Sequence, residues 1–192
     1  FPAEYGDCII LSIGKESQYN ILIDGGLSKT YHKYIKAEIQ HIKELGQKIG
    51  LMVCTHMDND HICGLIQVLK GTNFNFIENV WYNGFLQIVN SRFYSQKENI
   101  FTEKDNKILD EIISQGMLLD VDQEVGINEG MSLGVLIEER RIPLNSAARG
   151  QAICSELVKN KYEIAPSIFI TILGPSKDNI IELEEYWKKE MV

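Results

Sequence analysis

The sequence predicts a layered α/β protein, and three observations support this prediction. Short apolar runs at residues 8–13 and 19–23 have the length and the β-branched composition of strands. Apolar side chains at spacings of four, four and three predict an amphipathic helix over 31–45. Residues 49–55 are almost wholly apolar, which is typical of a strand that is buried on both faces of its sheet.

The elements of the N-terminal part follow one another in a regular order. Residues 8–13 and 19–23 predict a β-hairpin, because a polar turn separates them. Asp24-Gly25-Gly26 comes next, and paired glycines at the end of a strand permit positive φ and the close approach of another backbone. After the strand at 49–55, a polar loop leads into a helix over 62–70.

The later elements have weaker patterns, except at the C-terminal end, where a strand, a Gly-Pro turn and a helix are clear. We expect Ile180, Leu183 and Trp187 on the buried face of this last helix. The predicted elements are a strand at 77–82, a helix over 103–115, short strands with glycine turns between 120 and 141, a helix over 146–160, a strand at 168–173 and a helix over 177–190.

Length and composition predict one globular domain over residues 1–192. Hydrophobic residues make up 44% of the chain and charged residues 24%, which excludes disordered and fibrous classes. No apolar stretch approaches the roughly 18 residues of a membrane span. The net charge of −8 repels nucleic acid, so an anionic ligand would need a local counter-charge such as metal ions.

The cysteines give an expectation about the compartment. Cys8, Cys54, Cys63 and Cys154 lie far apart in apolar surroundings and show no CxxC spacing. This pattern argues against a disulfide framework and against a zinc knuckle. We therefore expect reduced, buried thiols in a cytoplasmic protein.

Four metal-binding side chains stand together in the loop that follows the buried strand. His56, Asp58, Asp60 and His61 offer imidazole nitrogens and carboxylate oxygens within six residues. A loop leaving a strand can turn the first two toward one point, while the last two, entering a helix, point to a neighbouring one. The loop can therefore serve two ions. The alternative is a solvated loop in which Asp60 only caps the following helix.

The segment from Thr55 to Leu65 (Thr-His-Met-Asp-Asn-Asp-His-Ile-Cys-Gly-Leu) resembles the HxHxDH metal motif of the metallo-β-lactamase-fold hydrolases. Its HxDxDH form is similar to the hydrolase domain of ComEC-like DNA-uptake competence proteins. Three further pieces match in the expected order: Tyr5-Gly6-Asp7-Cys8, Ile23-Asp24-Gly25-Gly26 and Leu173-Gly174-Pro175. The resemblance implies an αββα sandwich with a site for two metal ions on the edges of its sheets.

The resemblance also implies roles for single residues. His56 and Asp58 would bind the first ion, and Asp60 and His61 the second, with Asp60 as the catalytic residue that activates or orients water. Asp24 would hold a ligand histidine in its tautomer, or it is simply a turn aspartate. The ions are expected to be zinc or manganese, with magnesium possible, because Asp58 replaces a histidine and makes the first site harder.

The chain also departs from the family pattern. A complete site takes a further histidine and a bridging aspartate, yet no histidine follows His61, and the only Gly-Asp pair is Gly6-Asp7. We therefore expect this chain to hold only the N-terminal half to two-thirds of the sandwich, truncated on its C-terminal side, with the remaining ligands beyond Val192. By itself, the fragment is expected to be inactive.

The preferred functional prediction is a metal-dependent hydrolase of the phosphodiesterase or nuclease type, with nucleic acid or another phosphodiester as substrate. A thioester or lactam hydrolase would use the same metal chemistry. A third hypothesis is a non-catalytic or sensor module that keeps the hydrolase fold inside a larger multidomain protein, for example a defence protein.

Overall fold

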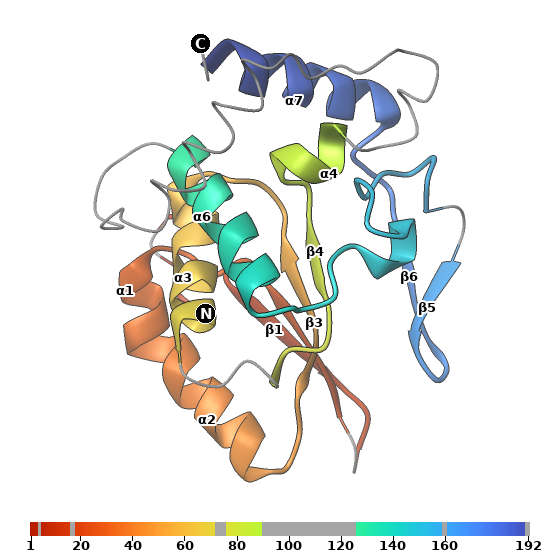
Figure 1. Cartoon of the computed structure of the whole chain (residues 1–192). Helices are drawn as coiled ribbons and strands as arrows, with labels where there is room; N and C mark the ends of the chain where they lie inside the picture. Colours follow the sequence, from red (N-terminus) through yellow and green to blue (C-terminus); the bar gives the residue numbers. More distant parts are fainter. Residues whose placement is uncertain (4, 16–17, 72–75, 90–125, 159–160, 191–192) are drawn as a thin grey trace.

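A computed structural model describes residues 1–3, 5–15, 18–71, 76–89, 126–158 and 161–190, and these form a mixed α/β architecture. The central sheet has the strand order β1-β2-β3-β4 (Figure 1). Strand β1 is antiparallel to β2, whereas β2, β3 and β4 are parallel. The strands are β1 (Ile9–Ile13), β2 (Tyr19–Ile23), β3 (Ile49–Cys54) and β4 (Val80–Tyr82).

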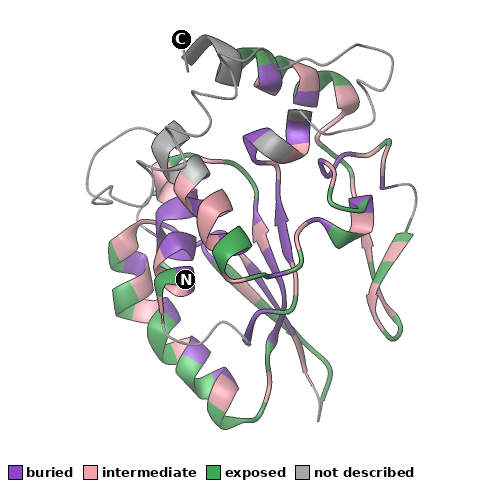
Figure 2. Ribbon diagram, in the orientation of Figure 1, coloured by how far each residue is buried: buried purple, intermediate pink, exposed green. Residues whose placement is uncertain are grey.

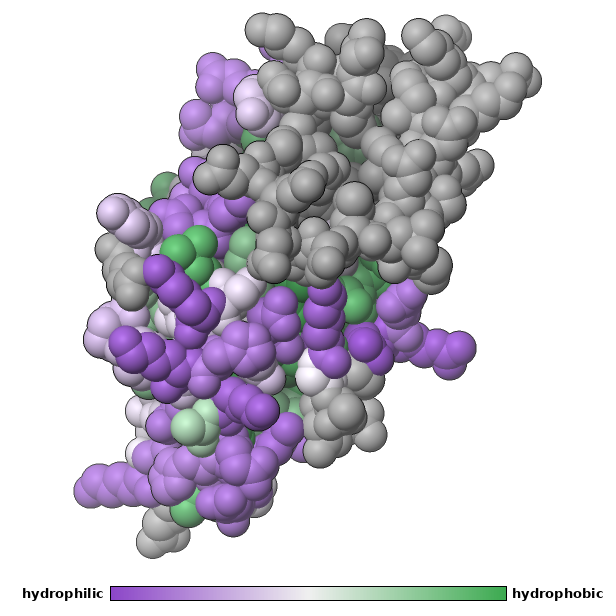
Figure 3. Space-filling view, turned by 90° about the vertical axis from the view of Figure 1, so that its left-hand side faces the viewer, coloured by the Kyte–Doolittle hydropathy of each residue, from purple (hydrophilic) through white to green (hydrophobic). Residues whose placement is uncertain are grey.

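Helices cover one face of this sheet. The N-terminal helical run consists of α1 (Ser28–Thr30), the π-helical turn η1 (Tyr31–Ile35) and α2 (Lys36–Glu44). This run packs against α3 (Asn59–Lys70), which in turn packs against α6 (Gly126–Glu139) (Figure 1). Buried residues concentrate on strands β2, β3 and β4 and on α3 (Figure 2). Figure 3 views the molecule from the side of the helices, and its coloured surface is mainly hydrophilic. The helices are therefore amphipathic and turn their apolar stripes toward the sheet.

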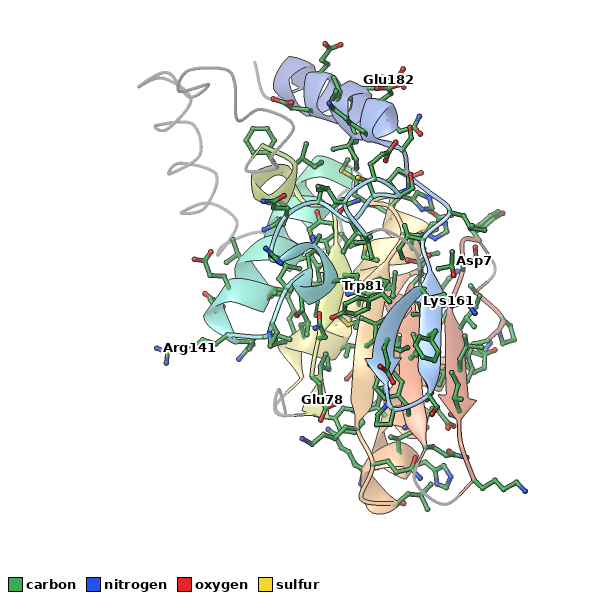
Figure 4. The ribbon with its side chains drawn as sticks, turned by 90° about the vertical axis from the view of Figure 1, so that its right-hand side faces the viewer. Asp7, Glu78, Trp81, Arg141, Lys161 and Glu182 are labelled. Carbon is green, nitrogen blue, oxygen red and sulfur yellow. The ribbon has the colours of Figure 1, made fainter. Side chains whose placement is uncertain are left out.

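A second hairpin lies on the other face of the sheet. It consists of β5 (Lys161–Ala165) and β6 (Ile168–Thr171), which are antiparallel. A separate apolar cluster joins this hairpin to the sheet, and the rings of Trp81 and Tyr162 lie 6.0 Å apart within it. Figure 4 shows Trp81 beside the hairpin. The described layers are therefore helices, sheet and hairpin, with α4 (Phe85–Val89) and α7 (Lys177–Glu190) packed together at one end (Figure 1).

Most N-terminal predictions are confirmed. The predicted hairpin forms β1 and β2, with Ile9 opposite Ile23, and β3 is buried along nearly its whole length. The helix after the ligand loop begins at Asn59, earlier than predicted. The predicted strand at 77–82 is shorter, because only Val80–Tyr82 forms β4 and Ile77 makes a single bridge to β3.

The short strands predicted between 120 and 141 are wrong where the structure describes that segment. Residues Gly126–Glu139 form the single helix α6. Leu133 and Ile137, four residues apart, are fully buried on the side that packs against α3. Glycines that suggest turns in the sequence are tolerated here, because helix packing outweighs their cost of about 1 kcal/mol each.

The helix predicted over 146–160 is also wrong, because in the described part of that range, 146–158, the one helical element is the 3₁₀ turn η4 (Ser146–Ala148). Asn145 and Arg149 on either side adopt left-handed conformations, with φ of 49° and 56°, which a helix cannot continue. The side chain of Asn145 bonds the backbone N–H and the carbonyl of Tyr82. The segment therefore pairs with the edge of β4 through side-chain amides.

At the C-terminal end, β6 and α7 confirm the predicted strand and helix, although the strand ends at Thr171. Ile180 is buried and Leu183 is half-buried, as expected. The side chain of Trp187, the helix predicted over 103–115, and residues 120–125 lie outside the described residues. Among those that are described, no helix is long and apolar enough to cross a membrane.

The four cysteines are free and buried, which agrees with the expectation of reduced thiols. Burial raises the pKa of the Cys8 thiol to about 11, and it also raises the pKa of Cys54 and of Cys154.

The reactivity of the thiols tests this burial. At about pH 8 we expect a disulfide reagent to modify, on average, less than one thiol per folded chain within minutes, and all four thiols after denaturation. Rapid reaction of a thiol in the folded chain would contradict this packing.

Candidate metal centre

The candidate site lies at one edge of the central sheet. Strands β2 and β3 are parallel, so their carboxyl ends meet there. Asp24 directly follows β2, Thr55 and His56 follow β3, and α3 begins a few residues later. The carboxyl edge of parallel strands is where α/β proteins commonly bind ligands.

Close backbone contact fixes the loop after β2 against α3. The N–H of Gly25 donates to the carbonyl of His61 at 2.7 Å, and the N–H of Gly64 donates to the carbonyl of Gly26 at 2.9 Å. A Cβ atom on either Gly25 or Gly64 would overlap the backbone of the other segment. The close approach predicted from the paired glycines is therefore confirmed, and its partner is the helix that carries His61.

The N-terminal loop joins the same cluster. The carbonyl of Asp7 accepts a hydrogen bond from the N–H of Gly26 at 2.9 Å. Gly6 has a φ of 71°, and a Cβ atom there would overlap the backbone carbonyl of Asp60. Three of the sequence pieces that carry the family resemblance, around Gly6, Gly25 and His61, thus meet at one place.

Asp24 is the buried centre of the hydrogen-bond network. It is 1% exposed and has a φ of 53°, a conformation that aspartate tolerates better than most residues. Its Oδ1 accepts from the Thr55 N–H at 2.8 Å, and its Oδ2 accepts from the Thr55 hydroxyl at 2.5 Å. Oδ2 also lies 2.9 Å from Nδ1 of His61. These contacts exclude the alternative that Asp24 is only a residue of the turn.

The contact between Asp24 and His61 decides which ring nitrogen is free. An ionised carboxylate accepts hydrogen bonds only, so the His61 ring donates from Nδ1. The second nitrogen, Nε2, is then unprotonated in the neutral ring and can bind a metal ion. Asp24 thus has the position expected of a residue that holds a ligand histidine in its tautomer.

The four ligand candidates are arranged as two pairs. Nε2 of His56 lies 3.6 Å from Oδ2 of Asp58, and Nε2 of His61 lies 3.9 Å from Oδ2 of Asp60. The two rings are adjacent, with centroids 3.7 Å apart. Side-chain exposure is 10% for His61, 35% for Asp60, 47% for His56 and 71% for Asp58. The site therefore runs from a buried side to an open side.

These separations fit divalent ions. Metal bonds to imidazole nitrogen and carboxylate oxygen are about 2.1 Å long, so one ion can span separations up to about 4 Å. Ligand atoms of Asp24, His56 and His61 also lie within 4.8 Å of one another. Besides this cluster, the two Nε2 atoms and the carboxylates of Asp58 and Asp60 are available as donors to an ion.

The interpretation of Asp60 as a helix cap is wrong. In the described chain the N-cap of α3 is Asp58, which makes no side-chain cap hydrogen bond, and Asp60 lies inside the first turn. A carboxylate in the first turn of a helix interacts favourably with the helix dipole.

Cys54 supports the backbone of the loop. Its thiol donates to the carbonyl of His56 at 3.1 Å. Burial, and then the charge of Asp24, raise the pKa of this thiol well above its usual range. The neutral Cys54 thiol therefore holds the backbone of His56 in place through this hydrogen bond.

The sequence analysis gave no role to Thr55, which the structure places between Asp24 and His56. The signal for Thr55 in the sequence is weak, since a hydroxyl beside a histidine is common in loops.

No protein-family model, no curated protein and no solved structure matches this chain significantly, so the functional conclusion rests on the residues and distances of this site.

Proposed function

We propose that the chain is the metal-binding part of a hydrolase with the metallo-β-lactamase fold, which cleaves phosphodiesters such as nucleic acid. One observation carries the proposal. The His56–Asp58 and His61–Asp60 pairs stand side by side at the edge of the sheet, and buried Asp24 supports His61. The layers of helices, sheet and hairpin support the further proposal of an αββα sandwich.

Each residue has a defined task in this proposal. His56 and Asp58 would hold one divalent ion, and Asp60 and His61 would hold the other. When bound, such ions would supply a nucleophilic water near neutral pH and neutralise charge on a phosphoryl group. Asp60, half-buried beside His61, would orient that water, and Asp24 would keep Nε2 of His61 available.

The donor set supports the choice of substrate. Carboxylates at Asp58 and Asp60 make the site harder than one built of histidines, which favours manganese or magnesium beside zinc. The chain has a net charge of −8, so a phosphodiester would be repelled elsewhere on its surface. Two divalent ions would create one place of positive charge, and an anionic substrate would bind there.

The proposal is tested on the protein at its natural length. We expect about two equivalents of zinc or manganese, and cleavage of labelled single-stranded DNA, duplex DNA or RNA that a chelator abolishes. Asp60→Ala should lower the cleavage rate at least about 100-fold, because it removes both a ligand and the group that orients water. Asp178→Ala removes an exposed carboxylate of α7 and should leave the rate unchanged.

Other outcomes would overturn this function. Equal cleavage by the natural protein and by Asp60→Ala would show that this loop is not the active site. Metal binding without cleavage of any phosphodiester would favour the sensor module. Cleavage of thioesters or lactams but not of nucleic acid would keep the metal chemistry and replace the substrate.

A further inference from the structure

Thr55 connects the two halves of the candidate site. Its backbone N–H and its hydroxyl both donate to Asp24, at 2.8 Å and 2.5 Å. The same hydroxyl oxygen lies 3.0 Å from Nδ1 of His56. Asp24 therefore contacts His61 directly and His56 through one intervening hydroxyl.

The positions of the protons follow from the chemistry of these groups. A hydroxyl has one hydrogen, and an ionised carboxylate only accepts. A separation of 2.5 Å between the Thr55 hydroxyl and Asp24 is typical of a short, charge-assisted bond, so the hydroxyl hydrogen points to Asp24. The Thr55 oxygen can then only accept from His56, which requires a proton on Nδ1 of His56.

We propose that Thr55 is a positioning residue that extends the influence of Asp24 to His56, so that one buried carboxylate fixes the Nδ1–H tautomer of both histidines. Both Nε2 atoms are then unprotonated together. The metal-binding part of this inference rests on the proposed function, whereas the tautomers themselves do not depend on a bound ion.

The burial of the partners explains why such a connection is needed. The imidazole of His56 is 47% exposed, and a hydrogen bond between exposed groups is weak when water competes. Thr55 is itself exposed, but two hydrogen bonds hold it to the buried Asp24. The thiol of Cys54 holds the His56 carbonyl from the other direction. An exposed ring thereby acquires a fixed orientation.

The test reads the tautomers directly. The chain is labelled with ¹⁵N at histidine, and long-range ¹H–¹⁵N spectra are recorded without metal at about pH 8, where free imidazole is neutral. We expect Nδ1–H for His56 and His61, and the mixed tautomers of free imidazole for the exposed His41. In Thr55→Val, His56 should become mixed while His61 keeps Nδ1–H. Thr55→Ser should restore Nδ1–H at His56.

Metal affinity supplies the second measurement, on the protein at its natural length. Loss of a partner behind a ligand typically costs 10- to 100-fold in affinity, so Thr55→Val should weaken zinc binding by about that factor. Thr55→Ser should bind nearly as tightly as the natural protein. Should Thr55→Val not fold, Thr55→Ala also lacks the hydroxyl and is measured in its place.

The role of Thr55 and the proposed function can be refuted separately. An unchanged His56 tautomer in both hydroxyl-free variants would overturn the role of Thr55, even if the protein binds metal and cleaves phosphodiesters. The expected tautomers in a natural protein that binds no metal would overturn the proposed function and leave the Thr55 connection intact. A Thr55→Ser variant with mixed His56 tautomers would also contradict the inference.

Discussion

Replacing His61 with alanine is expected to lower metal affinity by more than about 100-fold and to abolish phosphodiester cleavage. His61 is a proposed ligand, and loss of a residue that only supports a ligand already costs 10- to 100-fold. Metal content after dialysis and the initial rate of cleavage measure the effect on the protein at its natural length. A variant that retains its metal would show that His61 is not a ligand.

The variants around His61 separate binding from folding. His61→Ala also removes a donor to buried Asp24, which costs about 1–3 kcal/mol of folding free energy. His61→Asn keeps a donor near the position of Nδ1 but has no counterpart of Nε2. It should therefore be more stable than His61→Ala and still lose the metal. His41→Ala is the matched control, because His41 is exposed on α2. It should change neither the metal affinity nor the folding free energy.

Replacing Gly64 with alanine is expected to destabilise the chain by about 3 kcal/mol, which lowers Tm by roughly 6–12 °C. The added methyl group would overlap the carbonyl of Gly25, and that carbonyl belongs to backbone rather than to a flexible side chain. This overlap can be removed only if the loop of Asp24 moves away from α3. Thermal unfolding followed by circular dichroism measures the change in Tm.

Gly134→Ala is the matched control for Gly64→Ala. Gly134 also lies inside a helix, but a Cβ atom there meets nothing within 4 Å. Alanine should therefore raise stability by up to about 1 kcal/mol through its higher helix propensity. Equal effects of the two substitutions would contradict the close packing of the Asp24 loop against α3.

Local sequence patterns predicted the elements that bury one regular stripe or one apolar run. Strand β3 is apolar throughout, and α7 follows a Gly-Pro turn with Ile180 on its inner side. Each of these patterns fixes the periodicity of the backbone without reference to distant residues. The four candidate ligands could be predicted for the same reason, since His56, Asp58, Asp60 and His61 stand close together in the chain.

Patterns failed where contacts between distant segments decide the conformation. The segment of α6 contains three glycines, yet it is helical, with Leu133 and Ile137 buried where it packs against α3. The helix predicted over 146–160 does not form, because the side chain of Asn145, directly before it, bonds Tyr82, which lies 63 residues away. Local patterns in one sequence do not reveal which distant residues a side chain will contact.

The sequence by itself determined the sheet-forming hairpin, the buried strand and the identity of the four candidate ligands. Only the tertiary structure decided how they are supported. Asp24 reaches Thr55 across 31 residues and His61 across 37 residues. The physical reason is that the sequence gives the residue type of each candidate ligand directly. The tautomer and the orientation of its side chain depend on hydrogen bonds that form only when two parallel strands end at the same edge of the sheet.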